Sequence, residues 1–235
     1  MLEIALLVLF GYLCGSVSFA YLCGRLCRGI DLREYGSAKL SGSNVYHQVS
    51  GPAMVVVGIL DIGKAALPTW IGLRLGLGLA AAVLAGLAAM VGHNWSLFLG
   101  LKGGRGIATA IGVLLVVFPW GFPWLLGWLA AGRLVPRVAA APALLGFVTL
   151  PLLAQIAGQA AETVWGCLAM LAIAVVKRLE GNRAVLPFGR KRWAVLGRRL
   201  LLDRDKADFD SWIERVPGAD PRLAAPVHDA HGQPD

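Results

Sequence analysis

The chain has 235 residues, of which 57% are hydrophobic and 15% are charged, and its formal net charge is +8 at pH 7. A soluble domain carries about 25% charged residues, so this composition excludes an ordinary soluble fold and predicts an all-α integral membrane protein. The positive charge does not indicate nucleic-acid binding, because much of it lies in short loops and in the tail after Val176, where membrane topology accounts for it.

Seven apolar segments are long enough, or nearly so, to cross a bilayer as helices, for which about 20 residues are needed. In chain order they cover about residues 2–26, 52–73, 77–99, 107–118, 124–134, 138–154 and 161–176. Pro119, Gly121 and Pro123 separate the fourth segment from the fifth. We therefore predict a polytopic membrane domain over residues 1–180 and a basic cytoplasmic tail over residues 181–235.

Lysine and arginine fall in every second connection between these segments. The residues concerned are Arg25, Arg28, Arg33 and Lys39, then Lys102 and Arg105, then Arg133 and Arg137, and finally Lys177 and Arg178 after the last helix. The alternate connections hold one arginine, Arg74. By the positive-inside rule, this alternation predicts an N-terminus outside the membrane and a C-terminus in the cytoplasm.

Two of the predicted cytoplasmic loops are rich in Gly and cations. The first covers residues 36–44 and includes Lys39, and the second covers residues 92–106 and includes Lys102 and Arg105. Backbone N–H groups in such loops converge on anions, most often phosphates. A flexible connector is the alternative for the first loop. Because two such loops lie on the same side, we predict that they form one site for an anionic substrate.

Ionisable residues within a membrane are usually paired or functional. Asp61 and Lys64 are three residues apart on one helical face, and a salt bridge that fixes helix packing is the favoured interpretation. His93 and Asn94 end the third segment, where either a capping role or a catalytic role for His93 fits the sequence. The four cysteines lie in or near apolar segments without metal-type spacing, so neither a disulfide nor a metal site is predicted.

The tail has basic residues interleaved with apolar ones at 190–193 and 198–199. This pattern predicts contact with the anionic headgroups of membrane lipids, with a merely solvated tail as the alternative. From about residue 217 onward Pro, Ala, Asp and His dominate, which predicts disorder.

Three stretches resemble the signatures of a known family. They are GSVSF at 15–19 with GIDLREYGS at 29–37 and SNV at 43–45, then LDIGKAALP at 60–68, and then GHNWSLFLGLKGGRGIAT at 92–109. In order and spacing they are similar to the bacterial acyl-phosphate-dependent glycerol-3-phosphate acyltransferases. The resemblance implies an inner-membrane enzyme of about seven helices that moves a fatty acyl group from acyl phosphate to the first hydroxyl of glycerol-3-phosphate. It implies no metal and no other cofactor.

The loops and the resemblance together assign roles by position. Ser37, Lys102 and His93 are the candidate catalytic residues. The candidate phosphate-binding residues are Lys39, Gly42, Ser43, Asn44, Gly103, Gly104 and Arg105, and the residues expected to orient the site are Asp31, Arg33, Asn94, Asp61 and Lys64.

The first loop departs from the family pattern Gly-Ser-Gly-Asn-x-Gly-Ala-Thr-Asn. Ala38 and Lys39 stand at its third and fourth places, Ser41 stands at its sixth, and His47 replaces an Arg common just after it. We interpret Lys39 as a replacement for that missing positive charge. The family's third signature, His-Arg-x-Asn after the last helix, is also degenerate here.

Two other functions remain as alternatives. A non-catalytic paralogue that binds acyl phosphate or lipid is suggested by the altered loop and the degenerate third signature. A small anion transporter is suggested by the charges within the membrane segments, but the chain lacks the inverted repeat typical of transporters.

Overall fold

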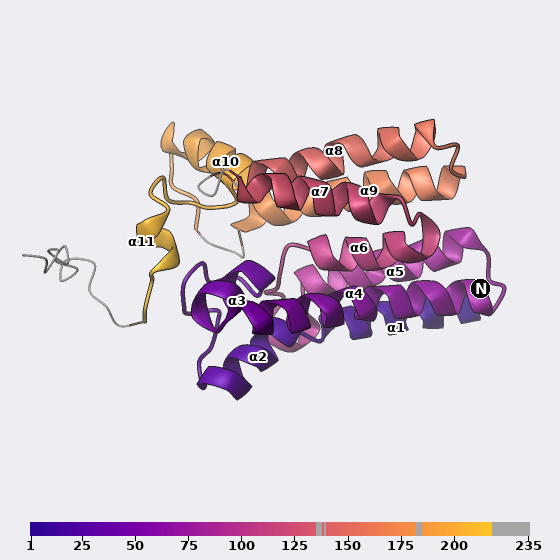
Figure 1. Cartoon of the computed structure of the whole chain (residues 1–235), viewed down its shortest axis with the longest axis horizontal. Helices are drawn as coiled ribbons and strands as arrows, with labels where there is room; N and C mark the ends of the chain where they lie inside the picture. The colour runs from indigo at the N-terminus through magenta and orange to yellow at the C-terminus, as the bar shows by residue number, and fades with distance from the viewer. Residues whose placement is uncertain (135–137, 139, 182–184, 218–235) are drawn as a thin grey trace, which may run out of the picture.

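The computed structural model describes residues 1–134, 138, 140–181 and 185–217, which form helices and no strand (Figure 1). The predicted all-α fold is therefore confirmed. The helices are α1 (Leu2–Ser16), α2 (Phe19–Arg28), α3 (Gly42–Gln48), α4 (Gly51–Arg74), α5 (Leu79–Asn94), a 3₁₀ turn η1 (Leu97–Leu99), α6 (Ile107–Val117), α7 (Gly121–Arg133), α8 (Ala140–Ile156), α9 (Ala161–Glu180), α10 (Lys191–Leu202) and α11 (Asp210–Ile213).

The long helices run alongside one another, and the short helices gather at one end of the bundle (Figure 1). Helix α5 is central, since it packs against α1, α4, α6 and α9, while α8 packs between α7 and α9. Met90, Leu114, Phe118, Phe147 and Met170 belong to the core cluster that joins these groups of helices. The short helices α2, α3, α10 and α11 lie at the end that carries both Gly-rich loops.

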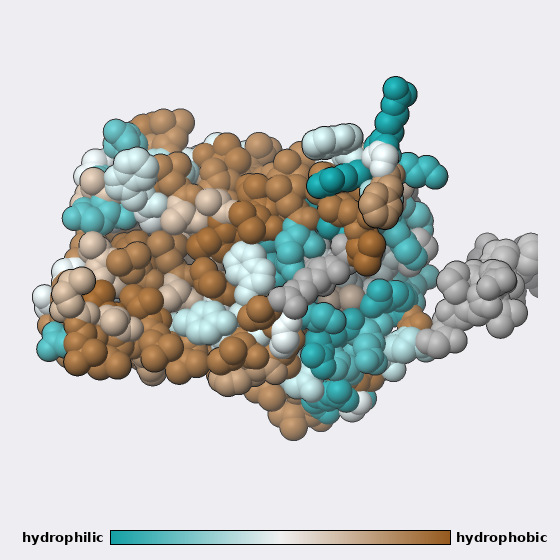
Figure 2. Space-filling view, turned by 180° about the vertical axis from the view of Figure 1, so that it is seen from behind, coloured by the Kyte–Doolittle hydropathy of each residue, from teal (hydrophilic) through white to brown (hydrophobic). Residues whose placement is uncertain are grey.

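The surface of the bundle is suited to lipid. Three segments are long and apolar enough to cross a membrane: Leu2–Arg28 (α1 with α2), Gly51–Arg74 (α4) and Leu79–Leu99 (α5 with η1). Two shorter apolar helices are Ile107–Val117 and Ala140–Ile156. In Figure 2, hydrophobic residues cover most of the visible face, and hydrophilic residues concentrate at the end with the short helices. This separation is expected of a protein whose body lies in hydrocarbon and whose polar end lies in water.

The predicted first helix, residues 2–26, is broken into α1 and α2. Val17 is extended after the end of α1, and Ser18 begins α2 by accepting a hydrogen bond from the N–H of Tyr21. The carbonyl oxygen of Val17 accepts a hydrogen bond from Lys64 Nζ at 2.6 Å. The break is thus stabilised by α4, and it turns α2 away from the bundle axis (Figure 1).

Other boundaries also differ from the prediction. The loop predicted at 27–51 contains α3, and the third predicted helix ends as α5 at Asn94 because the chain turns into η1. Helix α7 begins at Gly121 rather than 124, since Pro123 lies in its first turn, where no helical N–H is needed. Helix α9 continues to Glu180, so Lys177 and Arg178 are buried in its last turn rather than opening the tail.

Small residues allow α1 and α5 to approach closely. A Cβ atom added at Gly15 would overlap the carbonyl oxygen of Ala89, and one added at Gly92 would overlap that of Tyr12. Close backbone approach through small residues is a common way to pack helices within membranes. Because the second loop follows α5, this contact also fixes where that loop lies.

We predict that Gly15→Ala lowers the melting temperature in detergent by several degrees, because overpacking of this kind costs about 1–3 kcal/mol. The matched control is Gly58→Ala in α4, where an added Cβ would meet open space. That variant is expected to be neutral or slightly stabilising, as Ala is the better helix former. Equal melting temperatures for the two variants would contradict the proposed packing.

Candidate functional site

The first Gly-rich loop is held together by one amide side chain. Asn44 is fully buried, and its Oδ1 accepts a hydrogen bond from the N–H of Ser37 at 3.1 Å. Its Nδ2 donates to the carbonyl oxygens of Leu32, Tyr35 and Lys39 at 3.0–3.2 Å. Asn44 therefore ties the loop to α3. Because both polar atoms of the Asn44 side chain are hydrogen-bonded to backbone groups, Asn44 shapes the loop and is not free to bind a phosphate directly.

The backbone of this loop adopts left-handed conformations. Gly36 has a φ of 55°, and a Cβ there would lie 2.5 Å from Asn44 Oδ1. Ala38 has a φ of 56°, a conformation that costs a non-Gly residue free energy. Gly42 and Ser43 form the first turn of α3, outside the cavity described below.

The second loop folds back on the end of α5. The N–H of Gly104 donates a hydrogen bond to the carbonyl oxygen of His93 at 3.0 Å. A Cβ added at Gly103 would overlap that oxygen, and one added at Gly104 would overlap the His93 ring. The two glycines are therefore required by close packing against His93.

A buried charge network lies within the bundle. Lys64 Nζ is 2.7 Å from Asp61 Oδ1, and His93 Nδ1 is 3.6 Å from the same oxygen. The predicted Asp61–Lys64 pair is therefore present in the structure, where it links α4 to the end of α5. Asn94, the next residue after His93, is also fully buried. None of these four side chains lines the cavity formed by the loops.

The two loops face one cavity of about 480 Å³. Ser37 and Lys39 of the first loop line it together with Lys102 and Arg105 of the second. Its cationic lining residues, among those the structure describes, are Arg33, Lys39, Lys102, Arg105, Arg178, Arg199, Arg204, Lys206 and Arg215, whereas its carboxylates are Asp203 and Asp205. Such an excess of positive charge is suited to an anion, as the sequence predicted for these loops.

Asp31 positions one wall of this cavity. Its carboxylate accepts hydrogen bonds from the backbone N–H of Arg33 at 3.0 Å and from Arg33 Nη2 at 2.6 Å, and it also pairs with Arg25. Hydrogen bonding from the Arg33 side chain holds the pKa of Asp31 below its usual value, against the opposing effect of burial. The ion pair thus fixes the position of Arg33, which lines the cavity.

Asp203 was not predicted as a site residue. It follows α10, and its Oδ2 lies 2.7 Å from Lys39 Nζ while its Oδ1 lies 2.7 Å from Arg105 Nε. Burial acts to raise the pKa of Asp203, but Arg105 and Lys39 outweigh it and hold that pKa below the usual value. No sequence pattern marks this carboxylate, because it lies 164 residues from Lys39 and its role depends on the folded position of the tail.

The protonation of Lys39 is sensitive to pH near neutrality. Burial and the charge of Arg105 lower the pKa of Lys39 to about 7, although Asp203 acts in the opposite direction. Its ammonium also lies 4.7 Å from the centre of the Trp212 ring. A small change of pH near neutrality therefore changes the charge that this residue presents to the cavity.

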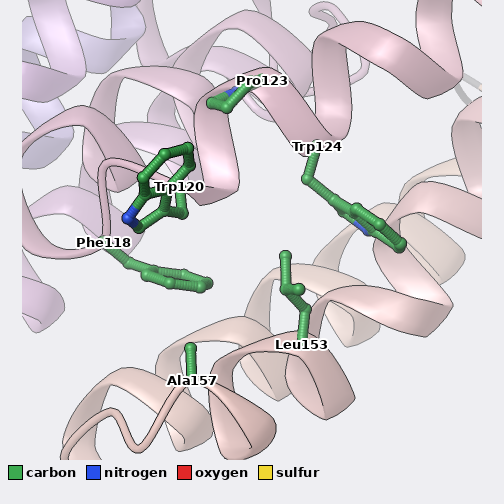
Figure 3. Close-up of a pocket in the computed structure, with 6 residues that line it drawn as sticks. All are labelled: Phe118, Trp120, Pro123, Trp124, Leu153 and Ala157. Carbon is green, nitrogen blue, oxygen red and sulfur yellow. The ribbon is translucent and has the colours of Figure 1, made fainter.

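A second, apolar cavity lies far from the loops. Its volume is about 400 Å³, and the residues lining it are Phe118, Trp120, Pro123, Trp124, Leu153 and Ala157 (Figure 3). Trp124 Nε1 donates a hydrogen bond to Thr149 Oγ1 at 3.1 Å, which links α7 to α8. The turn from α6 to α7 places this cavity at the opposite end of the bundle (Figure 1).

Comparison with known proteins identifies the family. Residues 5–186 match the family described as glycerol-3-phosphate acyltransferase. The chain belongs to this family. Glycerol-3-phosphate acyltransferase 5 of Dehalococcoides mccartyi is 34% identical over 87% of this chain and 90% of its own length. The glycerol-3-phosphate acyltransferase of Synechococcus sp. (strain CC9902) is 39% identical over 76% of this chain and 86% of its own length.

A solved structure has the same fold. The glycerol 3-phosphate form of PlsY (YgiH), an integral membrane glycerol 3-phosphate acyltransferase, superposes with a TM-score of 0.70 and 28% identity, covering 76% of this chain and 89% of PlsY. Its lysophosphatidic acid form gives a TM-score of 0.68. The family resemblance found in the sequence is thus confirmed. Since the family match ends at residue 186, the segment that carries Asp203 lies beyond it.

We predict that Asn44→Ala lowers stability by about 2–4 kcal/mol, because it leaves several buried backbone groups without their hydrogen-bond partner. Thermal unfolding in detergent would measure this loss. Ser43→Ala, one residue earlier on the same helix, is the control and is expected to change stability by less than about 0.5 kcal/mol. Similar losses in both variants would show that the Asn44 hydrogen bonds do not hold the loop.

The pKa of Lys39 predicts pH-dependent anion binding. As the pH rises from 6.5 to 8.5, Lys39 loses its proton, so the affinity for sulfate should fall by about tenfold. Sulfate keeps its charge over this range, and calorimetry would measure its dissociation constant. Lys39→Arg, which stays protonated, should remove the dependence. A wild-type affinity that does not change with pH would contradict this assignment.

Proposed function

We propose that the protein transfers a fatty acyl group from acyl phosphate to the sn-1 hydroxyl of glycerol-3-phosphate, giving lysophosphatidic acid and phosphate for phospholipid synthesis. Family membership supports the acyltransferase reaction. The observation that carries the proposal is the cavity in which Ser37 and Lys39 of one loop face Lys102 and Arg105 of the other. Both substrates are phosphates, and this cavity is strongly cationic.

The chemistry requires positioning and charge neutralisation. Acyl phosphate is an activated mixed anhydride, so no covalent enzyme intermediate is needed. The glycerol hydroxyl oxygen forms the new ester bond to the acyl carbon, the bond from that carbon to the phosphate oxygen breaks, and the phosphate leaves with the hydroxyl proton. Cations fixed around both phosphates favour this reaction by holding the reactants together and stabilising the leaving group.

Different cavity residues would neutralise charge and bind phosphate. Lys102 is exposed on the second loop and would neutralise charge that develops on the oxyanion or the leaving phosphate. Arg105 and Lys39 would bind the acceptor phosphate, with Ser37 beside them. His93 would act indirectly, because its ring contacts Asp61 and its backbone holds Gly104.

We propose seven membrane crossings, by α1, α4, α5, α6, α7, α8 and α9, in a bacterial inner membrane. The N-terminus would lie outside, and the active site and C-terminal tail would lie in the cytoplasm. An odd number of crossings is supported by the position of Met1 at the end of the bundle opposite α10 and α11 (Figure 1). The cytoplasmic side is supported by the cations of the two loops and the tail, and the tail would contact lipid headgroups.

The reaction can be tested with protein reconstituted in lipid, palmitoyl phosphate and glycerol-3-phosphate, by measuring phosphate release. We expect turnover that needs both substrates, and a loss of about 10²–10³ in kcat/KM for Lys102→Ala. Ser37→Ala should also be strongly impaired.

Lys191→Ala is the matched control, since Lys191 is exposed at the same end of the molecule but does not line the cavity. It should retain wild-type activity. Phosphate release with acyl phosphate alone would indicate hydrolysis and another acceptor. Binding of acyl phosphate without any turnover would favour the non-catalytic paralogue.

A further inference from the structure

The segment that follows α10 is anchored on the first loop. The N–H of Gly36 donates a hydrogen bond to the carbonyl oxygen of Arg215 at 2.8 Å. Gln48 Nε2, at the end of α3, donates to the carbonyl oxygen of Ile213 at 3.1 Å. Residues 203–215, which we call the C-terminal strap, therefore connect the far side of the cavity to α3. They lie outside the matched family region, which ends at residue 186.

The strap places a carboxylate among the cations assigned to the acceptor phosphate. Asp203 contacts both Lys39 and Arg105, each at 2.7 Å, and its side chain is 15% exposed. It adopts this position from a left-handed turn with a φ of 53°. A carboxylate that accepts from one lysine and one arginine uses the same donors that a phosphate would use.

Asp203 does not satisfy all the donors present. Arg105 is 8% exposed, and its Nη1 atom is buried without a hydrogen-bond partner among the described residues. The charge of Asp203 is −1, whereas a phosphate monoester near neutral pH carries close to −2 and three acceptor oxygens. A phosphate can therefore engage donors that the carboxylate leaves unpaired, so the two anions compete for one position.

We propose that the C-terminal strap is an autoinhibitory lid, in which Asp203 occupies the position of the acceptor phosphate and so sets the affinity for the acceptor. Glycerol-3-phosphate must displace Asp203 from Lys39 and Arg105 before it binds. This proposal rests on the proposed function for the identity of the acceptor. It also explains why Lys39, a departure from the family loop, faces a carboxylate that lies beyond the family match.

The kinetic test compares Asp203→Asn with the wild type in the full-length protein in lipid. The neutral amide competes less well, so the KM for glycerol-3-phosphate should fall by about tenfold, with kcat changed less than twofold. Glu214→Gln is the control, because it removes one charge from the same strap without lining the cavity. It should leave KM unchanged. A raised KM or a collapsed kcat in Asp203→Asn would show that Asp203 positions the cations, and would overturn the proposal.

A second variant loosens the lid without changing its charge. Gln48→Ala removes the side-chain hydrogen bond to Ile213 and lies outside the cavity. Under the proposal it lowers KM for glycerol-3-phosphate, although by less than Asp203→Asn does. A KM that is unchanged or raised, in protein with a wild-type melting temperature, would mean that the strap does not oppose substrate binding.

A binding test gives an answer even if the protein shows no turnover. Inorganic phosphate should bind Asp203→Asn about tenfold more tightly than it binds the wild type. In hydrogen-exchange mass spectrometry of the wild type, saturating inorganic phosphate should increase exchange over residues 205–215. Equal phosphate affinities, or slower exchange in the strap, would overturn the lid. Absence of turnover with these binding results intact would contradict the proposed function alone.

Discussion

The structure depends on how an apolar bundle accommodates charge. In a hydrocarbon environment an ionisable side chain has to be paired or placed at the end of the bundle. The chain does both: Asp61 and Lys64 of α4 pair inside the bundle, and nine cations among the described residues line the cavity at the end with the short helices (Figure 2). Because only the end of the bundle is open to water, the charged residues collect there. The loops at that end form the cavity, and its lining is therefore cationic.

The loops are held rigidly by small residues and by one amide. Gly103 and Gly104 pack against His93, and Asn44 closes the first loop through four hydrogen bonds to the backbone. Several residues with the strongest family signal therefore shape the site without lining its cavity. The break between α1 and α2, which Lys64 stabilises, also positions the first loop. It turns the chain so that α2 and the loop after it lie at the end of the bundle.

The tail changes the electrostatics of the site. Without Asp203, the adjacent Lys39 and Arg105 side chains would have no carboxylate between them. The Asp203 carboxylate lies 2.7 Å from Lys39 Nζ and 2.7 Å from Arg105 Nε, so it pairs with two cavity cations at once. A lysine that departs from the family loop pattern and a carboxylate that lies beyond the matched family region meet in one ion pair. This suggests that the loop and the tail function as a unit.

The sequence by itself determined the membrane class, the all-α fold, the family and the pairing of the two Gly-rich loops at one cavity, because composition, helix length and contiguous motifs are local properties of the chain. It also located Arg33, Lys39, Lys102 and Arg105 among the nine cationic cavity residues that the structure describes, and it anticipated the Asp61–Lys64 pair from helical spacing. Only the tertiary structure decided that Asn44 and His93 contact the loops without lining the cavity, that α1 and α2 are separate, and that Asp203 lines the cavity. These features depend on contacts between segments far apart in sequence, up to 164 residues for Lys39 and Asp203, and no local pattern encodes them.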